Sequence, residues 1–417
     1  MRLYAWCAAA VVVVFLGAAS TQASPQNVGV LVDSSLYPQI QSGLNGYMTD
    51  VEGLFNVNFK VYQGNFESQT PEQVRSFLQE KYASDSLSGV FLTGQIPYAT
   101  WEQRVPSSPP NHSIQNKGLC SFYYEDLDGT FVDEWNRDNH EGIYDAGKLD
   151  HHYQGAQVGP EIWVSWLRPR PSQQASDLNN FFAKAHDYYE GNTRIESRGL
   201  IALHDHYDGA WVYTLGPMQD MFDEVDMFGE GDESAIDSQI EAALSSHAYG
   251  LFDPWSHANN AGHYWDSGVT SYVDLYNLPA GSGSLITMIF GCSSAAFNTG
   301  EEQSMTKAYV FGPGIGQAAA GTSWSYGIDE ASKPRLYSAL AEGQPLVEAW
   351  FDTQMFLEDG NGCYVRYGTA VDPETHLFGH NFIGNPFVFA HSIPEPATLV
   401  VACLGLVLLL RKRRRAL

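Results

Sequence analysis

The first hundred residues of the chain alternate between short apolar runs and segments whose apolar residues recur at helical spacing. Apolar residues recur at every fourth position from Leu36 to Met48, which is typical of one face of a helix. Thr70 followed by Pro71 has the form of an N-cap with proline at the first helical position. A strand, a helix, a strand, a helix and a strand are expected at residues 27–33, 34–51, 57–62, 70–82 and 89–94. This order predicts a parallel sheet with helices on its faces.

The alternation stops at residues 102–160, which are polar, acidic and rich in Gly, Pro and Tyr, and we expect a long ordered insertion there. Further on, strands are expected at 161–167, 199–205, 248–254, 285–290 and 314–320, and helices at 172–189, 235–245, 303–310 and 332–354. The chain shows no internal repeat. The pattern predicts an α/β fold with a mostly parallel sheet, in two coupled subdomains at residues 24–192, which include the insertion, and 193–391.

Residues 1–23 have the three parts of a secretory signal peptide. Arg2 supplies the positive charge, Ala8 to Leu16 form an apolar run, and a small residue, Ala23, offers a cleavage site shortly before Pro25. A permanent membrane anchor is the alternative, but the apolar run is short for a bilayer and is followed at once by small and polar residues. We therefore expect an exported protein.

Residues 392–417 form a second targeting segment, with Pro394-Glu395-Pro396, an apolar stretch at 397–410 and five consecutive cations at 411–415. An apolar helix followed by cations stops in the membrane with the cations on the cytoplasmic side. This order resembles the PEP-CTERM sorting signal of Gram-negative bacteria. The resemblance implies a transmembrane helix that anchors the chain transiently until an exosortase removes it. An ordinary tail anchor is the alternative, and both place the body at the cell surface or outside the cell.

The body between the two ends is strongly acidic. Six of the 22 basic residues and none of the 48 acidic ones lie in residues 1–23 and 397–417, so the body carries a formal charge near −32. Such a surface repels nucleic acids and anionic membranes. The charge excludes nucleic-acid binding and suits a soluble extracellular protein or one that binds divalent cations.

A cysteine and a histidine follow two of the expected strands. Residues 285–291 form an apolar run that leads directly into Cys292, and residues 249–255 lead through Ser256 into His257. Parallel strands present their carboxyl ends at one edge of a sheet, so neighbouring strands would bring these two side chains within reach of one another. A Cys–His pair is the minimum for thiolate catalysis, and the backbone N–H groups of Ala258 and Cys292 are candidates for an oxyanion hole. His263 is the competing histidine, but His257 directly follows the strand.

The cysteine count points to the same thiol. Cys7 and Cys403 lie in the targeting segments, which leaves Cys120, Cys292 and Cys363 in the body. An odd number in an oxidising compartment leaves one thiol unpaired. We expect a disulfide between Cys120 and Cys363, with Cys292 as the free thiol.

The arrangement resembles the gingipain family of cysteine peptidases, which shares the caspase-like fold. In that family a histidine motif follows one strand, and the nucleophilic cysteine follows another some 30 to 40 residues later; here His257 and Cys292 are 35 residues apart. Further matching segments, in chain order, are Tyr123 to Gly129, Pro160 to Val164, Phe297-Asn298, Gly316 to Ser323 and Ile383 to Pro386. The resemblance covers about residues 27–390. One departure is that Ser256 and Ala258 replace the glycines that usually flank the histidine.

The resemblance implies an endopeptidase that hydrolyses peptide bonds of protein or peptide substrates through a thioester on Cys292, with His257 as base and acid and no required cofactor. Asp205 would orient His257 or line the specificity pocket. A catalytically inactive cell-surface or matrix domain of the same fold is the alternative.

Two metal hypotheses follow from the remaining polar residues. His204 and His206 lie on one face of an expected strand end, a spacing that can bind zinc, so a metal-dependent hydrolase is a further alternative. Asp126, Asp128 and Asp133 place carboxylates around Gly129, which resembles part of a calcium loop. The very acidic body favours a calcium ion there.

Overall fold

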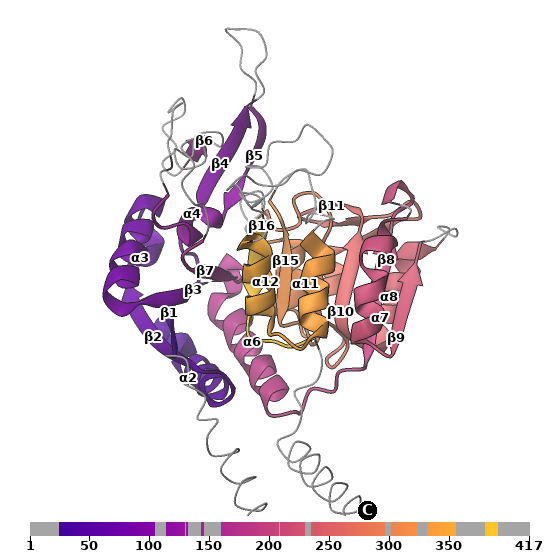
Figure 1. Cartoon of the computed structure of the whole chain (residues 1–417), viewed down its shortest axis with the longest axis horizontal. Helices are drawn as coiled ribbons and strands as arrows, with labels where there is room; N and C mark the ends of the chain where they lie inside the picture. Colours follow the sequence, from indigo (N-terminus) through magenta and orange to yellow (C-terminus); the bar gives the residue numbers. More distant parts are fainter. Residues whose placement is uncertain are drawn as a thin grey trace, which may run out of the picture.

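The structure, a computed structural model, describes residues 25–104, 114–129, 131, 143–145, 160–207, 209–229, 235–296, 302–323, 332–355 and 380–390. Its main sheet is built from β1 (Gln26–Asp33), β2 (Val57–Gly64), β3 (Leu87–Thr93), β7 (Trp163–Leu167), β8 (Arg198–Leu203), β9 (Glu224–Phe228), β10 (Ala248–Trp255), β14 (Gly283–Met288), β15 (Ala318–Thr322) and β16 (His380–Gly384). These ten strands lie in the order β2-β1-β3-β7-β16-β15-β14-β10-β8-β9 (Figure 1). The first four strands of this order are called the N-terminal half below, and the other six the C-terminal half.

Neighbouring strands are parallel within each half, except that β16 is antiparallel to β15. The two halves meet where Trp166 of β7 pairs with Ile383 of β16. The sheet is therefore continuous from one half to the other. The division into subdomains at residue 192 stays a prediction.

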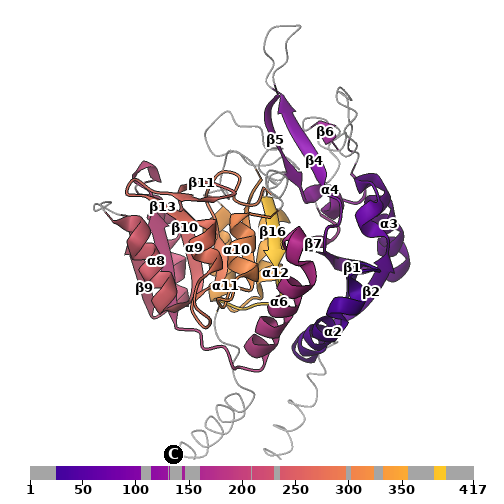
Figure 2. The ribbon, with the colours of Figure 1, turned by 180° about the vertical axis from the view of Figure 1, so that it is seen from behind.

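Helices cover both faces of the sheet. They are α2 (Tyr37–Leu54), α3 (Pro71–Asp85), α4 (Phe122–Glu125), α6 (Gln174–Tyr189), α7 (Leu215–Met221), α8 (Ile236–Ser246), α9 (Tyr272–Tyr276), α10 (Met305–Phe311), α11 (Ser332–Ala341) and α12 (Leu346–Met355). Figure 1 shows α7, α11 and α12 on one face of the C-terminal half, and Figure 2 shows α8, α9 and α10 on the other. All residues of β10, β14 and β15 are buried, as expected for parallel strands covered on both sides.

The expected elements of the first hundred residues are observed with small shifts at their ends. The predicted start of α3 is confirmed in detail: Gln73 N–H donates to Thr70 Oγ1 (3.4 Å), and Thr70 N–H donates to Gln73 Oε1 (2.9 Å). This reciprocal pair satisfies two backbone donors that the first turn of a helix leaves open.

The single helix expected at 332–354 was wrong, because α11 and α12 are separate. Gly343 has a left-handed φ of 85°, which ends α11. Pro345 follows and lacks the N–H that a continuing helix would need. The hydrophobic pattern runs through this break, but the backbone does not.

Two small sheets extend the main one. The first, in the order β5-β4-β6, lies in the expected insertion and contains β4 (Ala99–Arg104), β5 (Ile114–Cys120) and β6 (Ile143–Asp145). The second, β11-β12-β13, contains β11 (His257–Asn259), β12 (Gly262–Tyr264) and β13 (Val269–Ser271), and was not predicted. It follows β10 directly and therefore shapes the surroundings of His257.

Both predicted targeting segments lie outside the described residues, so the signal peptide and the PEP-CTERM signal stay predictions. Among the helices of the described residues, none has both the length and the apolar character needed to cross a bilayer.

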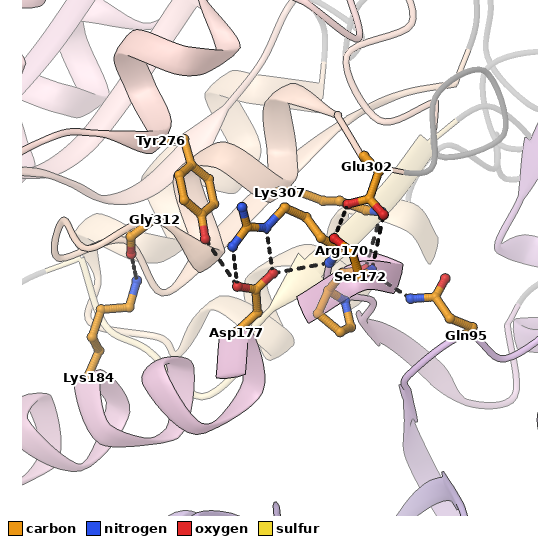
Figure 3. A network of polar contacts seen from close by, with 10 residues as sticks. Gln95, Arg170, Ser172, Asp177, Lys184, Tyr276, Glu302, Lys307 and Gly312 are labelled. Carbon is orange, nitrogen blue, oxygen red and sulfur yellow. Dashed lines mark hydrogen bonds and ion pairs between the residues drawn. The ribbon is translucent and has the colours of Figure 1, made fainter. Parts of the chain in front are cut away.

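A network of polar contacts joins the segment after β7 to the C-terminal half (Figure 3). Arg170 forms a two-pronged ion pair with Asp177 of α6, with Nη2–Oδ1 at 2.7 Å and Nε–Oδ2 at 2.9 Å. The hydroxyl of Tyr276 on α9 donates to the same carboxylate (3.1 Å). Ser172 N–H and Oγ–H donate to Glu302, which precedes α10. The network ties together residues that are 99 to 130 positions apart in the sequence.

Candidate active site

The strands that precede His257 and Cys292, β10 and β14, are immediate neighbours. In the parallel register of β10 and β14, Leu251 pairs with Ile286, and Trp255 forms a bridge with Phe290. The register is extended by Ser256 N–H, which donates to Phe290 O (3.0 Å). The offset of 35 residues is constant along the pair and equals the sequence separation of His257 and Cys292. The two residues therefore follow neighbouring strands at matching positions of one sheet edge.

Cys292 begins a tight turn at the end of β14. Ser293 has a φ of 52°, which a residue with a side chain rarely adopts. The neighbouring contacts hold this turn against the end of β15: Thr322 Oγ1–H donates to Gly291 O (3.1 Å), and Ala295 N–H donates to Thr322 O (2.8 Å). Strained backbone of this kind persists only where the surrounding contacts determine it, and it is often found at functional sites.

Gly291 explains how the sequence accommodates Ala258. A Cβ atom placed on Gly291 would lie 2.7 Å from the Ala258 methyl group, which is too close for two carbon atoms. Gly291 thus leaves the space that the side chain of Ala258 occupies beside the cysteine turn. The alanine at position 258, where the resemblance predicts a glycine, is thus matched by a glycine that follows the neighbouring strand.

The thiol of Cys292 is half-buried. Burial raises its pKa, and the hydrogen bond from its own backbone amide opposes this only in part. An ordinary thiol already has a pKa near 8.5. Cys292 therefore carries its proton at neutral pH in the resting protein.

His257 has the opposite shift. Its pKa is lowered, first by loss of water around the packed part of the ring and then by the neighbouring rings of His204 and His206. The carboxylates of Asp205 and Asp266 oppose this shift. The imidazole is therefore neutral at neutral pH and able to accept a proton.

Aromatic and imidazole rings crowd around His257 on the side of β8. The centroid of its ring lies 4.8 Å from that of His204, 5.5 Å from that of His206 and 5.6 Å from that of Tyr207. His204 follows β8, and the other two lie in the short helix η3 (Asp205–Tyr207). Because β8 is the other neighbour of β10, the predicted zinc histidines and the predicted catalytic histidine share one site.

Asp205 contacts His204: Asp205 Oδ1 lies 2.6 Å from His204 Nδ1. Its role as a partner of His257 or as part of a specificity pocket stays a prediction. Asp266, in the turn between β12 and β13, completes the group, with Oδ1 3.5 Å from His204 Nε2. No sequence pattern pointed to Asp266, because it reaches the site through the unpredicted small sheet.

His263, the competing histidine, is fully buried. Its Nδ1 lies 2.8 Å from Ser256 Oγ, and its Nε2 lies 2.9 Å from Tyr309 OH. Burial lowers the pKa of His263 to about 3, so the ring stays neutral. Both ring nitrogens have protein partners, and His263 is a structural histidine that links β12 to α10.

The candidate calcium residues are brought together only in part. Oxygen atoms of Asp126, Asp128 and Glu161 lie within 4.8 Å of one another, whereas Asp133 lies outside the described residues. Asp126 is buried, and burial followed by the nearby Glu161 raises the pKa of its carboxyl group to about 7. Glu161, which the sequence places in an expected strand and in the Pro160 to Val164 segment, lies beside this acidic turn.

Cys120 is buried in the core and has no disulfide partner among the described residues. Cys363 lies outside those residues. The pairing of Cys120 with Cys363 therefore stays a prediction.

Comparison with known proteins identifies the fold. No protein-family model and no curated protein sequence matches the chain. A solved structure of a protease matches with a TM-score of 0.60 and 11% identity, over 91% of this chain and 81% of its own. The complex of the pro- and mature domains of Porphyromonas gingivalis RgpB matches with a TM-score of 0.56 and 12% identity, over 88% of this chain and 80% of its own. The chain thus has a gingipain-like α/β fold, which confirms the fold class predicted from the sequence.

Proposed function

We propose that the protein is an exported cysteine endopeptidase in which Cys292 is the nucleophile and His257 the general base and acid. The observation that carries the proposal is the register of β10 and β14, which puts both residues at matching positions of one sheet edge. The gingipain-like fold supports a peptidase. The strained turn at Ser293 supports a functional role for the cysteine that precedes it.

The reaction would begin from a neutral pair. Cys292 keeps its proton because burial raises the pKa of the thiol, and His257 is unprotonated because its surroundings lower the pKa of the imidazole. Proton transfer from Sγ to the imidazole would therefore accompany attack on the substrate. A preformed thiolate–imidazolium pair is not needed for this mechanism.

The chemical steps follow from these protonation states. Cys292 Sγ attacks the peptide carbonyl carbon while His257 takes the thiol proton, and backbone N–H groups of Ala258 and Cys292 hold the oxyanion. The C–N bond then breaks, and the imidazolium gives its proton to the leaving amine. Water attacks the resulting thioester with His257 as base, which releases the carboxylic acid and restores the thiol.

The test uses the purified chain with a library of peptides that varies the residue before the cleaved bond. We expect turnover that is lost in Cys292→Ala and in His257→Ala, and that is kept in His186→Ala, which changes a histidine at a distant surface of α6. A thiol-directed electrophile should label Cys292 and leave the buried Cys120 unmodified. No turnover together with no labelling of Cys292 would sink the peptidase and leave the inactive surface domain as the better reading.

The proposal includes the predicted export and sorting segments and the predicted calcium ion. Export would follow from residues 1–23, and processing at residues 392–417 by an exosortase would release the body from a transient membrane anchor.

Asp126, Asp128 and Glu161 supply the oxygen ligands that calcium prefers. Adding calcium should raise the melting temperature of the chain, and Asp128→Asn should remove this effect. An equal rise in Asp128→Asn would contradict a calcium ion at this turn.

A further inference from the structure

We propose that His204 and Asp266 bind a zinc ion that shares the imidazole of His257 and so inhibits the peptidase reversibly. The consequence for activity rests on the proposed function, but the site itself rests on geometry alone. Zinc was expected above as the centre of a rival hydrolase. The geometry points instead to an inhibitory zinc ion at the site of a cysteine peptidase.

The distance between the first two donors fits one zinc ion. Zinc is bound at about 2.0–2.2 Å by nitrogen and oxygen ligands in a tetrahedral arrangement, which separates any two ligands by about 3.3–3.6 Å. His204 Nε2 and Asp266 Oδ1 are 3.5 Å apart. An ion between them would therefore need little movement of either side chain.

The other nitrogen of His204 has the partner that metal-binding histidines usually have. A histidine that ligates a metal through one nitrogen commonly donates the other N–H to a carboxylate, which fixes the ring and its tautomer. His204 Nδ1 lies 2.6 Å from Asp205 Oδ1. The backbone N–H of His206 donates to the same Nδ1 (3.0 Å). When zinc binds, a proton on Nδ1 that is donated to Asp205 would replace this hydrogen bond and leave Nε2 free for the metal. Asp205 would then hold a ligand of the metal in place and would not touch the metal itself.

His257 offers the third ligand. Its ring centroid is 4.8 Å from that of His204, and the two histidines follow neighbouring parallel strands, β8 and β10. His206, 5.5 Å from His257, is a candidate for the fourth position, which a water molecule would otherwise fill. Ligand atoms of His204, Asp205 and Asp266 lie within 4.8 Å of one another, and the ring of His257 would turn toward them to complete the site. Imidazoles together with one carboxylate suit zinc better than calcium.

The consequence for catalysis is direct. A nitrogen lone pair that binds zinc cannot accept the thiol proton, so His257 would lose its role as base while the metal is bound. Removal of zinc would restore the lone pair. The site would then keep the peptidase silent where zinc is plentiful.

The binding experiment is a calorimetric titration of zinc chloride into the full chain carrying Cys292→Ala, which prevents the thiol from binding the metal. Adding Asp266→Asn or His204→Ala should weaken the strongest zinc site at least about tenfold, and Asp205→Asn should weaken it on the order of tenfold. Asp266 is exposed, so its substitution leaves the core intact. His186→Ala is the matched control, because His186 forms a comparable cluster with Asp50 and Glu190 on another surface. Unchanged affinity in Asp266→Asn and His204→Ala, or a loss in His186→Ala, would overturn the site.

The activity experiment uses the chain with Cys292 intact. Zinc should inhibit peptide hydrolysis, a chelator should restore it, and Asp266→Asn should raise the zinc concentration for half-inhibition by the same factor as the loss of affinity. Hydrolysis that a chelator abolishes and that survives in Cys292→Ala would make the metal catalytic and overturn the inhibitory role. If no peptide is hydrolysed under any condition, the proposed peptidase fails, while the titration still decides whether the zinc site exists.

Discussion

The two halves of the sheet carry different polar groups after their strands. After β7, in the N-terminal half, the charges of Arg170 and Asp177 satisfy each other in a two-pronged pair, and the hydroxyl of Tyr276 joins this pair to α9. After β10 and β14, in the C-terminal half, a neutral imidazole and a protonated thiol occupy matching positions, and their pKa values are shifted in opposite directions. The comparison teaches that polar residues after similar strands can either hold two segments together or form a reactive site. An ion pair holds Arg170 and Asp177 in place, whereas ring packing and burial shift the pKa values of His257 and Cys292.

The largest effect is expected from removing the base at the reactive edge. His257→Ala should lower kcat/KM for peptide hydrolysis by a thousandfold or more, on the order seen when one member of a catalytic pair is lost. Its side chain is exposed, so the free energy of unfolding should change little. Activity and denaturation measured on the same sample check both statements. If the variant were much less stable but each folded molecule kept its activity, His257 would be a structural residue and not the catalytic base.

Breaking the ion pair of Arg170 and Asp177 should have the opposite effect, a loss of stability without a loss of reactivity at Cys292. Arg170→Ala leaves the buried Asp177 without its cation, and breaking such a pair from one side costs about 3 kcal/mol of unfolding free energy. Labelling of Cys292 by an electrophile should be unchanged while the protein remains folded. Lys60→Ala is the control, because its ion pair with Asp85 is open to solvent and should contribute little to the free energy of unfolding. Equal losses in the two variants in a urea titration would contradict the distinction.

His263 tests whether the buried contacts behind the reactive edge support it. His263→Phe leaves Ser256 Oγ and Tyr309 OH without the partners they have now, which should cost about 1–3 kcal/mol. Ser256 immediately precedes His257, so kcat should fall moderately while KM changes little. Kinetics and urea denaturation measure the two effects. A loss of activity as large as that of His257→Ala would show that the assignment of the two histidines is wrong.

The sequence predicted those parts of the site that depend on strand order. Apolar runs before His257 and Cys292, together with the parallel sheet that they imply, were sufficient to expect the two side chains at one edge. Asp266 could not be found in this way, because it lies in a turn between two three-residue strands, which are too short to show a period. The contact of His263 with Tyr309 joins residues 46 positions apart, and no local pattern records it. Gly343 and Pro345 mark the break between α11 and α12, although the hydrophobic pattern continues through it.

The smallest expected effect concerns the pH dependence of the reactive edge, measured with a chelator present. As a base, His257 must be unprotonated, so activity is present above its pKa and is lost as the pH falls through it. The surroundings lower this pKa, which places the acid limb below the ordinary value of about 6.5. Asp266 opposes that shift, so Asp266→Asn should move the acid limb of kcat/KM to still lower pH, by a fraction of a unit. His204→Ala removes a ring that lowers the pKa and should move the limb upward. Shifts of the same sign in both variants would show that the charges around His257 do not set its pKa. The contrast between the site of His257 and Cys292 and the ion pair of Arg170 and Asp177 would then have no electrostatic basis.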